Sequence, residues 1–182
     1  MINVQDVKDF LGIDQTTDDD KIMPLCQAAQ NEAEVYCDRK LEGASRVEYY
    51  DGGGISSLQL KSYPIKAITS IYDDLDRGFN AEDLIAAADY TFTPETGITE
   101  LIGLVFADGT RNVKVTYEAG YGGTGYDPLP YDLRQALIQL ATAMYLEGKA
   151  GVNVFENQEI VYRPSYLKKE AYKVFDRYRR MA

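Results

Sequence analysis

One stretch of this sequence has the glycine spacing of a nucleotide-binding loop. GYGGTG, residues 120–125, matches Gly-x-Gly-x-x-Gly and follows a segment with strand periodicity. In a dinucleotide site, however, the third glycine lies in the first turn of a helix within a β-α-β unit, so that the helix N-terminus binds the phosphates. Here Asp127-Pro-Leu-Pro130 intervenes, and its prolines delay the helix. We therefore predict an exposed connecting loop without nucleotide affinity, and we expect no cofactor.

Two clusters of acidic residues have the composition of metal sites but the wrong spacing. Asp18–Asp20 are consecutive at an expected helix start, where they point in different directions and are favoured by the helix dipole instead. The run DDLDRG, residues 73–78, resembles a calcium-binding loop, but Leu75 and Arg77 stand where oxygen ligands belong and Leu84 replaces the closing glutamate. We predict helix capping at the first cluster, an exposed hairpin tip at the second, and no metal site.

Catalysis by histidine is excluded because the chain contains no histidine. Neither a Ser-His nor a Cys-His pair can form, and no imidazole is available as a base near pH 7. The two cysteines, Cys26 and Cys37, lie on one expected helix, which separates them by roughly 16 Å. That distance is too long for a disulfide, so we expect two buried thiols. Chemistry based on carboxylates or lysine stays open.

Charge is distributed unevenly along the chain. The net charge is −10, yet residues 163–182 carry seven basic and two acidic side chains, so the rest of the chain carries −15. An acidic body repels DNA over most of its surface, whereas the basic end offers one patch to an acidic partner. A solvated amphipathic end helix would have the same composition. No apolar run is long enough to span a membrane, and the first residues do not resemble a signal peptide, so we expect a protein that contacts no membrane and stays where it is made.

Apolar periodicity predicts four helices, two at each end of the chain. Asn3 is the expected cap of the first helix, and Thr16 or Thr17 that of the second, which Gly43 is expected to close. A polar stretch at Lys149–Gln158 is expected to be mobile. The expected helices cover 4–11, 18–41, 131–148 and 164 onward.

Between residues 46 and 118 the periodicity changes to two, which predicts β-strands. Asp51-Gly-Gly-Gly54 is expected to form a hairpin turn between the first two strands, and Asp108-Gly109 a further turn. A helical turn or an irregular crossing is expected at 82–88. The expected strands cover 46–50, 57–60, 64–72, 89–93, 98–105 and 113–117.

This order of elements, without β-α-β alternation, predicts an α+β fold. We expect a small α-helical bundle, made of two N-terminal and two C-terminal helices, that is interrupted by an antiparallel β-rich insertion. The expected domains are 1–45 for the N-terminal helices, 46–118 for the insertion, and 119–182 for the helices that complete the bundle. Leu25, Ala29, Leu137 and Leu140 are expected to share one core.

Several short motifs on the two flanks occur in a distinctive order. V-x-x-V-K-x-F-L-x-I-D opens the chain at residues 4–14, and EVYCDRKL ends the second helix at 34–41. YEAGY at 117–121 precedes LPYDLRQALIQLA at 129–141, and DRYRR stands at 176–180. In this order the motifs resemble the head–tail connector, or head completion, proteins of tailed bacteriophages. The insertion, residues 46–114, looks longer than a small hairpin and departs from that pattern.

The resemblance implies a structural protein of a phage or prophage, not an enzyme. Such proteins form a ring of about twelve copies beneath the portal protein, a closed cyclic arrangement. The ring extends the DNA channel, through which DNA passes without sequence-specific binding, and it docks the next neck or tail-completion protein. The expected location is the virion neck, after assembly in the cytoplasm of the bacterial host.

The basic terminal helix is the expected assembly surface, because its charge opposes that of the rest of the chain. Exposed ion pairs contribute only about 0–1 kcal/mol each, so apolar side chains must add to the contact. The candidate interface residues are Tyr166, Lys168, Lys169, Lys173, Phe175, Arg177, Tyr178, Arg179 and Arg180.

A second function class is a carbohydrate-binding or hydrolytic β module. Tyrosines and acids of the insertion would then line one face of a sheet. The mass in solution distinguishes the two classes, because a connector forms rings or self-associates and a module stays a monomer or dimer with a closed pocket. The residues available for such a face are Tyr49, Tyr50, Tyr72, Tyr90, Asp73 and Asp76.

Overall fold

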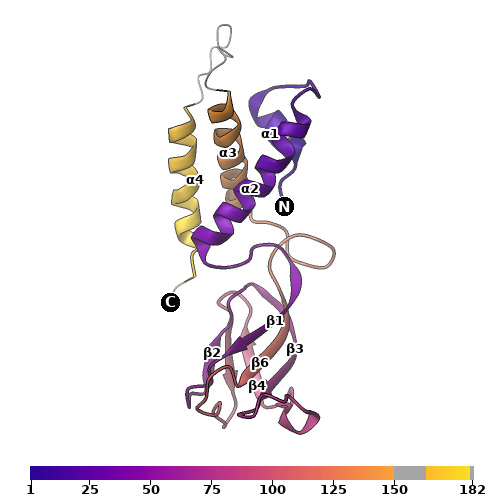
Figure 1. Ribbon diagram of the computed structural model, residues 1–182, viewed down its shortest axis with the longest axis vertical. Helices are drawn as coiled ribbons and strands as arrows, with labels where there is room; N and C mark the ends of the chain where they lie inside the picture. Colours follow the sequence, from indigo (N-terminus) through magenta and orange to yellow (C-terminus); the bar gives the residue numbers. More distant parts are fainter. Residues whose placement is uncertain (150–162, 181–182) are drawn as a thin grey trace. The chain divides into compact units, whose positions relative to one another are not determined.

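The computed structural model describes residues 1–149 and 163–180, and the chain divides into two compact units. The helical unit combines Met1–Arg39 with Leu129–Ala182, and the sheet unit is Lys40–Pro128. The fold is α+β, as predicted, with helices from both chain ends and antiparallel sheets between them in the sequence (Figure 1). Within the described residues no helix has the length and apolarity needed to cross a membrane. The stretch expected to be mobile, Lys149–Gln158, lies outside the described residues except for Lys149.

The helical unit is organised around α3, which contacts each of the other three helices. α1 begins with a capping box, in which Asn3 and Asp6 each accept the other's backbone N–H, and it ends at Gly12 in the left-handed region at φ 67°. The helices are α1 (Val4–Leu11), α2 (Asp19–Cys37), α3 (Tyr131–Gly148) and α4 (Pro164–Tyr178).

The C-terminal end of α2 lies earlier than predicted. The helix ends at Cys37 and does not continue to Leu41, because Asp38 takes the left-handed conformation at φ 51°. The Asp38 backbone N–H then donates to the carbonyl of Val35 at 3.2 Å. Aspartate tolerates this conformation better than most residues do, so it closes the helix before Gly43 is reached.

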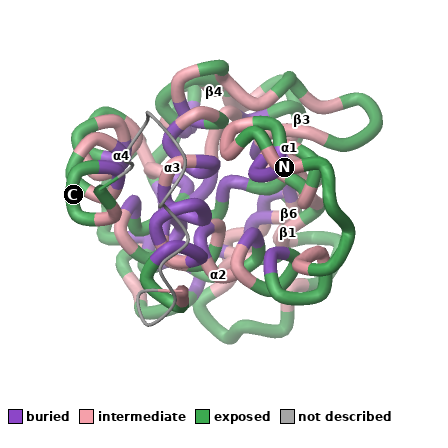
Figure 2. Tube along the Cα trace, turned by 90° about the horizontal axis from the view of Figure 1, so that it is seen from above, coloured by how far each residue is buried: buried purple, intermediate pink, exposed green. Residues whose placement is uncertain are grey.

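The core of the helical unit is built from both ends of the chain (Figure 2). Ala29, Leu137 and Leu140 are fully buried, as predicted, while Leu25 is only partly buried. The Cys37 thiol donates a weak hydrogen bond to the carbonyl of Phe175 at 3.6 Å, which links α2 to α4. Burial raises the pKa of Cys37 to about 11, so this thiol stays protonated.

The sheet unit contains two three-stranded antiparallel sheets, with orders β1-β6-β3 and β2-β5-β4. The side chains that alternate inward from β6 (Val113, Val115 and Tyr117) are fully buried in a core shared with strands of both sheets. The strands are β1 (Ala44–Tyr50), β2 (Ser57–Gln59), β3 (Ile65–Asp73), β4 (Tyr90–Thr93), β5 (Ile98–Leu101) and β6 (Val113–Ala119).

The predicted hairpin between β1 and β2 is wrong, because the two strands belong to different sheets. β1 pairs along its whole length with β6, and the glycines that follow it take the chain out of that sheet. The Gly52 N–H donates to the side-chain oxygen of Asn112 at 3.0 Å. A Cβ atom at Gly52 would stand 2.0 Å from the carbonyl oxygen of Ala107, so only glycine fits here. The turn is therefore shaped by residues far away in the sequence.

The run of residues 73–78 is also not a hairpin tip, because β3 and the next strand lie in different sheets. The Asp74 carboxylate accepts backbone N–H groups from Asp76, Gly78 and Phe79, and these hydrogen bonds, first that from Phe79, lower its pKa. The chain then makes one short helical turn, η1 (Ala81–Asp83), near the position predicted for one.

The glycine-rich loop after β6 crosses the segment that leads into β1. The Tyr121 N–H donates to the carbonyl of Leu41 at 2.7 Å, and the Gly43 N–H donates to the carbonyl of Tyr121 at 2.8 Å. Gly120 is buried here with φ 108°, and a Cβ atom on it would lie 2.5 Å from the carbonyl oxygen of Glu42. The later glycines, 123 and 125, are exposed as predicted. The glycines therefore allow two backbone segments to approach closely.

We expect Gly120→Ala to destabilise the sheet unit far more than Gly123→Ala does. Both positions have positive φ, which costs about 1–2 kcal/mol for alanine. Only at Gly120 does the new methyl group collide with backbone, whereas the nearest atom at Gly123 is 3.8 Å away. Urea unfolding of the two variants measures the difference, and equal losses would contradict the close approach described here.

Candidate assembly surfaces

One face of the terminal helix α4 belongs to the bundle core. Leu167, Ala171 and Phe175 follow a four-residue spacing, which places them on one face, and all three are buried. Phe175 is 0% exposed, so this member of the predicted interface contributes to the fold and is not accessible to a partner. The sequence pattern identified the helix but not which of its aromatic residues faces inward.

The opposite face of α4 carries an exposed stripe of one aromatic and three basic residues. We call Tyr166, Lys169, Lys173 and Arg177 the α4 stripe. The Tyr166 side chain is 61% exposed. Lys173 pairs with a glutamate of its own helix, and Arg177 with an aspartate of α3 at 3.1 Å, both near the surface. Among the described residues, Lys169 has no ion-pair partner.

The other predicted interface residues bind α2 or α3. Their hydrogen bonds, ion pairs and ring contact attach α4 to its own bundle, so a large share of the basic charge is neutralised within the chain. These contacts are Lys168 to Glu147 at 2.7 Å, Tyr178 to Asp132 at 2.6 Å, Arg180 to Asp38 at 2.6 Å, and the Arg179 guanidinium 5.9 Å from the ring centroid of Tyr36.

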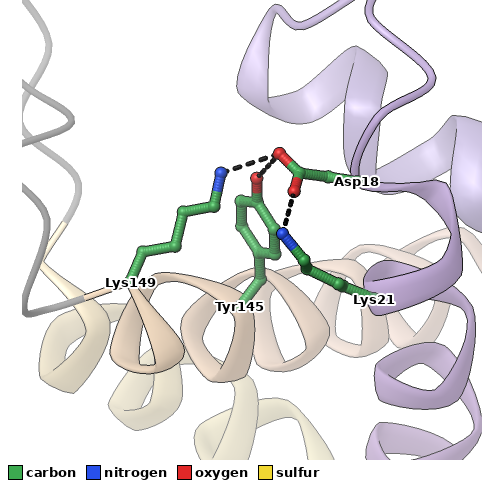
Figure 3. A network of polar contacts seen from close by, with 4 residues as sticks. All are labelled: Asp18, Lys21, Tyr145 and Lys149. Atoms are coloured by element: carbon green, nitrogen blue, oxygen red, sulfur yellow. Dashed lines mark hydrogen bonds and ion pairs between the residues drawn. The ribbon is translucent and has the colours of Figure 1, made fainter.

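A polar network joins the start of α2 to the end of α3 (Figure 3). One carboxylate oxygen of Asp18 accepts hydrogen bonds from Tyr145 and Lys149, each at 2.7 Å, and the other accepts one from Lys21 at 2.9 Å. The bond from Lys149 is the main cause that lowers the pKa of Asp18. Asp18 also raises the pKa of Lys149.

This network corrects the interpretation of the acidic run at residues 18–20. Asp18, not Thr16 or Thr17, occupies the capping position of α2, but its side chain makes no capping hydrogen bond. Its carboxylate instead binds α3 residues, of which Tyr145 is 127 positions away in the sequence. No local pattern could reveal these partners.

The tyrosines and acids proposed for a β module do not converge on one site. Tyr50 is buried, whereas Tyr72 lies on the outer side of the same sheet against Phe79, with ring centroids 6.5 Å apart. Asp73 accepts hydrogen bonds from the Ala107 N–H and the Asn112 side chain, at 2.7 and 2.8 Å. These hydrogen bonds show that Asp73 supports the fold of the sheet unit.

The sequence matches the profile of the family described as head completion protein over residues 1–181. This chain belongs to that family. No curated protein matches it.

Solved neck structures share the fold of this head completion protein. A chain in the neck of a native gene transfer agent particle, computed with C12 symmetry, is similar with a TM-score of 0.65 and 20% identity, over 98% of this chain and 88% of that one. A chain in the neck of an empty particle, computed with C6 symmetry, gives a TM-score of 0.64 and 19% identity, over 100% and 90%. The similarity in fold therefore includes the insertion, which had looked like a departure from the family.

The Asp18 network leads to a prediction about pH. Because the pKa of Asp18 in the folded state lies below its ordinary value of 3.8, the carboxylate stabilises the fold above that pH and loses this effect as the pH falls further. We expect Asp18→Asn to lower the free energy of unfolding at neutral pH, and the difference from the unmodified chain to shrink below about pH 4. Denaturant unfolding at several pH values measures it.

Asp20→Asn is the matched control for this experiment. Asp20 is exposed in the same first helical turn and has no side-chain partner among the described residues. A pH-independent effect of Asp18→Asn, or an equal effect at Asp20, would show that the network does not hold α2 to α3.

A second prediction concerns the glycine-rich loop of this head completion protein. The loop makes backbone contacts with Leu41 and Gly43, and Pro128 and Pro130 separate it from α3. We expect calorimetric titration with NAD, FAD or ATP to show no heat of binding. Micromolar binding of any of them would overturn this interpretation.

Proposed function

We propose that this head completion protein forms a ring beneath the portal protein of a phage or phage-like particle. The match to the family over residues 1–181 is the observation that carries the proposal. The related fold occurs in a neck computed with C12 symmetry, which supports a closed ring of about twelve copies. The ring extends the DNA channel in the virion neck and docks the next neck or tail-completion protein, after assembly in the host cytoplasm.

The charge of the chain supports a channel component that lets DNA pass. Residues 1–162 carry −15, so most of the surface repels the phosphate backbone and offers no basis for tight, sequence-independent binding. The chain has no histidine, and the acidic residues of the sheet unit described above support local structure. We infer a purely structural role, without catalysis.

The α4 stripe is the proposed assembly surface of the helical unit. The inward face of α4 is fixed in the bundle, so an assembling partner meets its outer face, where Tyr166, Lys169, Lys173 and Arg177 are exposed. Their charge fits the acidic surfaces that a neighbouring copy presents. Deleting α4 would expose the core around Phe175, so point variants on the stripe test its role better than truncation does.

The proposed ring is tested by electron microscopy of the concentrated protein, alone and mixed with the portal protein of the same particle. We expect rings with cyclic symmetry near twelvefold, and a mass in solution well above the 20.4 kDa of one chain. A chain that stays monomeric at every concentration, and that does not join the portal, would contradict the proposal.

A further inference from the structure

The sheet unit exposes a run of apolar side chains that do not pack in its own core. Directly after β5, Ile102, Leu104 and Val105 are 58%, 50% and 61% exposed. The chain on either side of them is anchored, because Leu101 and Phe106 are buried and both donate backbone N–H groups to residues 55–56. Consecutive exposed apolar residues are uncommon in a folded domain and mark a surface that contacts something else.

Part of this run forms one wall of an acidic groove. The groove has a volume of about 360 Å³, and its other wall is the segment around η1. Leu84, which is 46% exposed, lines the groove together with Leu104 and Val105, and Glu82 and Asp89 supply negative charge. The groove therefore combines apolar side chains with carboxylates, which suits an amphipathic and basic occupant.

Two of the groove carboxylates are available for such an occupant. Asp83 accepts the Asn80 backbone N–H in a capping box, and Asp73 is held by hydrogen bonds from residues 107 and 112. Glu82 and Asp89 have no side-chain hydrogen bond or ion pair among the described residues. A cation that enters the groove can bind them without breaking an internal contact.

The same chain carries a surface with the complementary chemistry. In the α4 stripe, Tyr166 is exposed at the first turn, and Lys169 and Lys173 follow on the same face. From Tyr166 to Lys173 the stripe spans roughly 10 Å of helix. It presents one aromatic ring and two ammonium groups, against a groove that presents apolar side chains and two carboxylates.

We propose that the groove of one copy binds the α4 stripe of the next copy in the ring. This contact rests on the proposed ring function and specifies its interface. It is heterologous, because each copy uses its groove toward one neighbour and its stripe toward the other, and contacts of this type form a ring when the rotation between copies closes. The apolar run becomes buried only on assembly, which explains why it is exposed in a single chain.

Substitutions that reverse the charge of each surface, made in the full chain, test this pairing. The groove variant is Glu82→Lys with Asp89→Lys, the stripe variant is Lys169→Glu with Lys173→Glu, and the third variant combines all four changes. We expect each double variant to lower the apparent association constant at least about tenfold, because like charges then face each other. The combined variant restores association, since a basic groove then meets an acidic stripe.

Two matched control variants, Glu95→Lys for charge and Val35→Ser for apolar surface, separate this contact from general effects of charge and hydrophobicity. Glu95→Lys makes the same substitution as Glu82→Lys, but at an exposed turn of the sheet unit outside the groove. Leu104→Ser removes an apolar side chain that lines the groove. Val35→Ser removes an apolar side chain that is 82% exposed on α2. We expect Leu104→Ser to weaken association, while Val35→Ser and Glu95→Lys leave it unchanged.

Sedimentation velocity and electron microscopy measure assembly, and circular dichroism confirms that each variant is folded. If the unmodified chain forms rings but the double variants also form them normally, the pairing is wrong and the ring function stands. If the double variants fail and the combined variant does not recover, the two surfaces bind other partners, such as the portal, and the pairing is again wrong. An unmodified chain that forms no ring, alone or with the portal, overturns the ring and this contact together.

Discussion

The helical core of this protein has to be assembled from the two ends of the chain. α2 comes from the first part of the sequence, and it packs against α3 and α4, which follow the sheet unit. Small buried residues on α2, Ala29 and Ala33, leave room for close packing, and the rings of Tyr36 and Tyr172 meet with centroids 4.9 Å apart. The direction in which α4 presents its charges depends on this closure, because Leu167, Ala171 and Phe175 are buried in the same core.

The chain enters and leaves the sheet unit through two segments that are neighbours in space. The hydrogen bonds between Tyr121 and the segment Leu41–Gly43 hold these two segments together. The absence of a side chain at Gly120 permits the approach, since a Cβ atom there would collide with the backbone of Glu42. In this loop, whose glycine spacing matches that of a nucleotide site, Gly120 allows two backbone segments to approach closely.

Local periodicity predicted the helices and strands because each signal is contained in a few consecutive residues. α3 begins and ends at the expected residues, and α4 begins where it was expected, for the same reason. Contacts between residues far apart in the sequence could not be predicted from such local signals. Asp51-Gly-Gly-Gly54 suits a hairpin as well as it suits a chain leaving a sheet, and Ala107 and Asn112 decide between the two.

For the candidate surfaces as well, local sequence patterns were informative, whereas contacts between residues far apart in the sequence could not be predicted. Composition identified a basic terminal helix, but not that Phe175 faces the core or that carboxylates of α2 and α3 neutralise part of its charge. The acidic groove was missed, although its signal was present. Residues 102–105 were assigned to a strand, while the strand ends at Leu101 and leaves the apolar run exposed.

The order of the two units along the chain has a consequence for synthesis. During translation the sheet unit, Lys40–Pro128, emerges as one continuous compact unit, so it can fold while later residues are still being added. α1 and α2 emerge earlier but must wait for α3 and α4. Because α4 supplies both the last part of the core and the exposed stripe, a chain released too early lacks a complete bundle core and the proposed assembly surface at once.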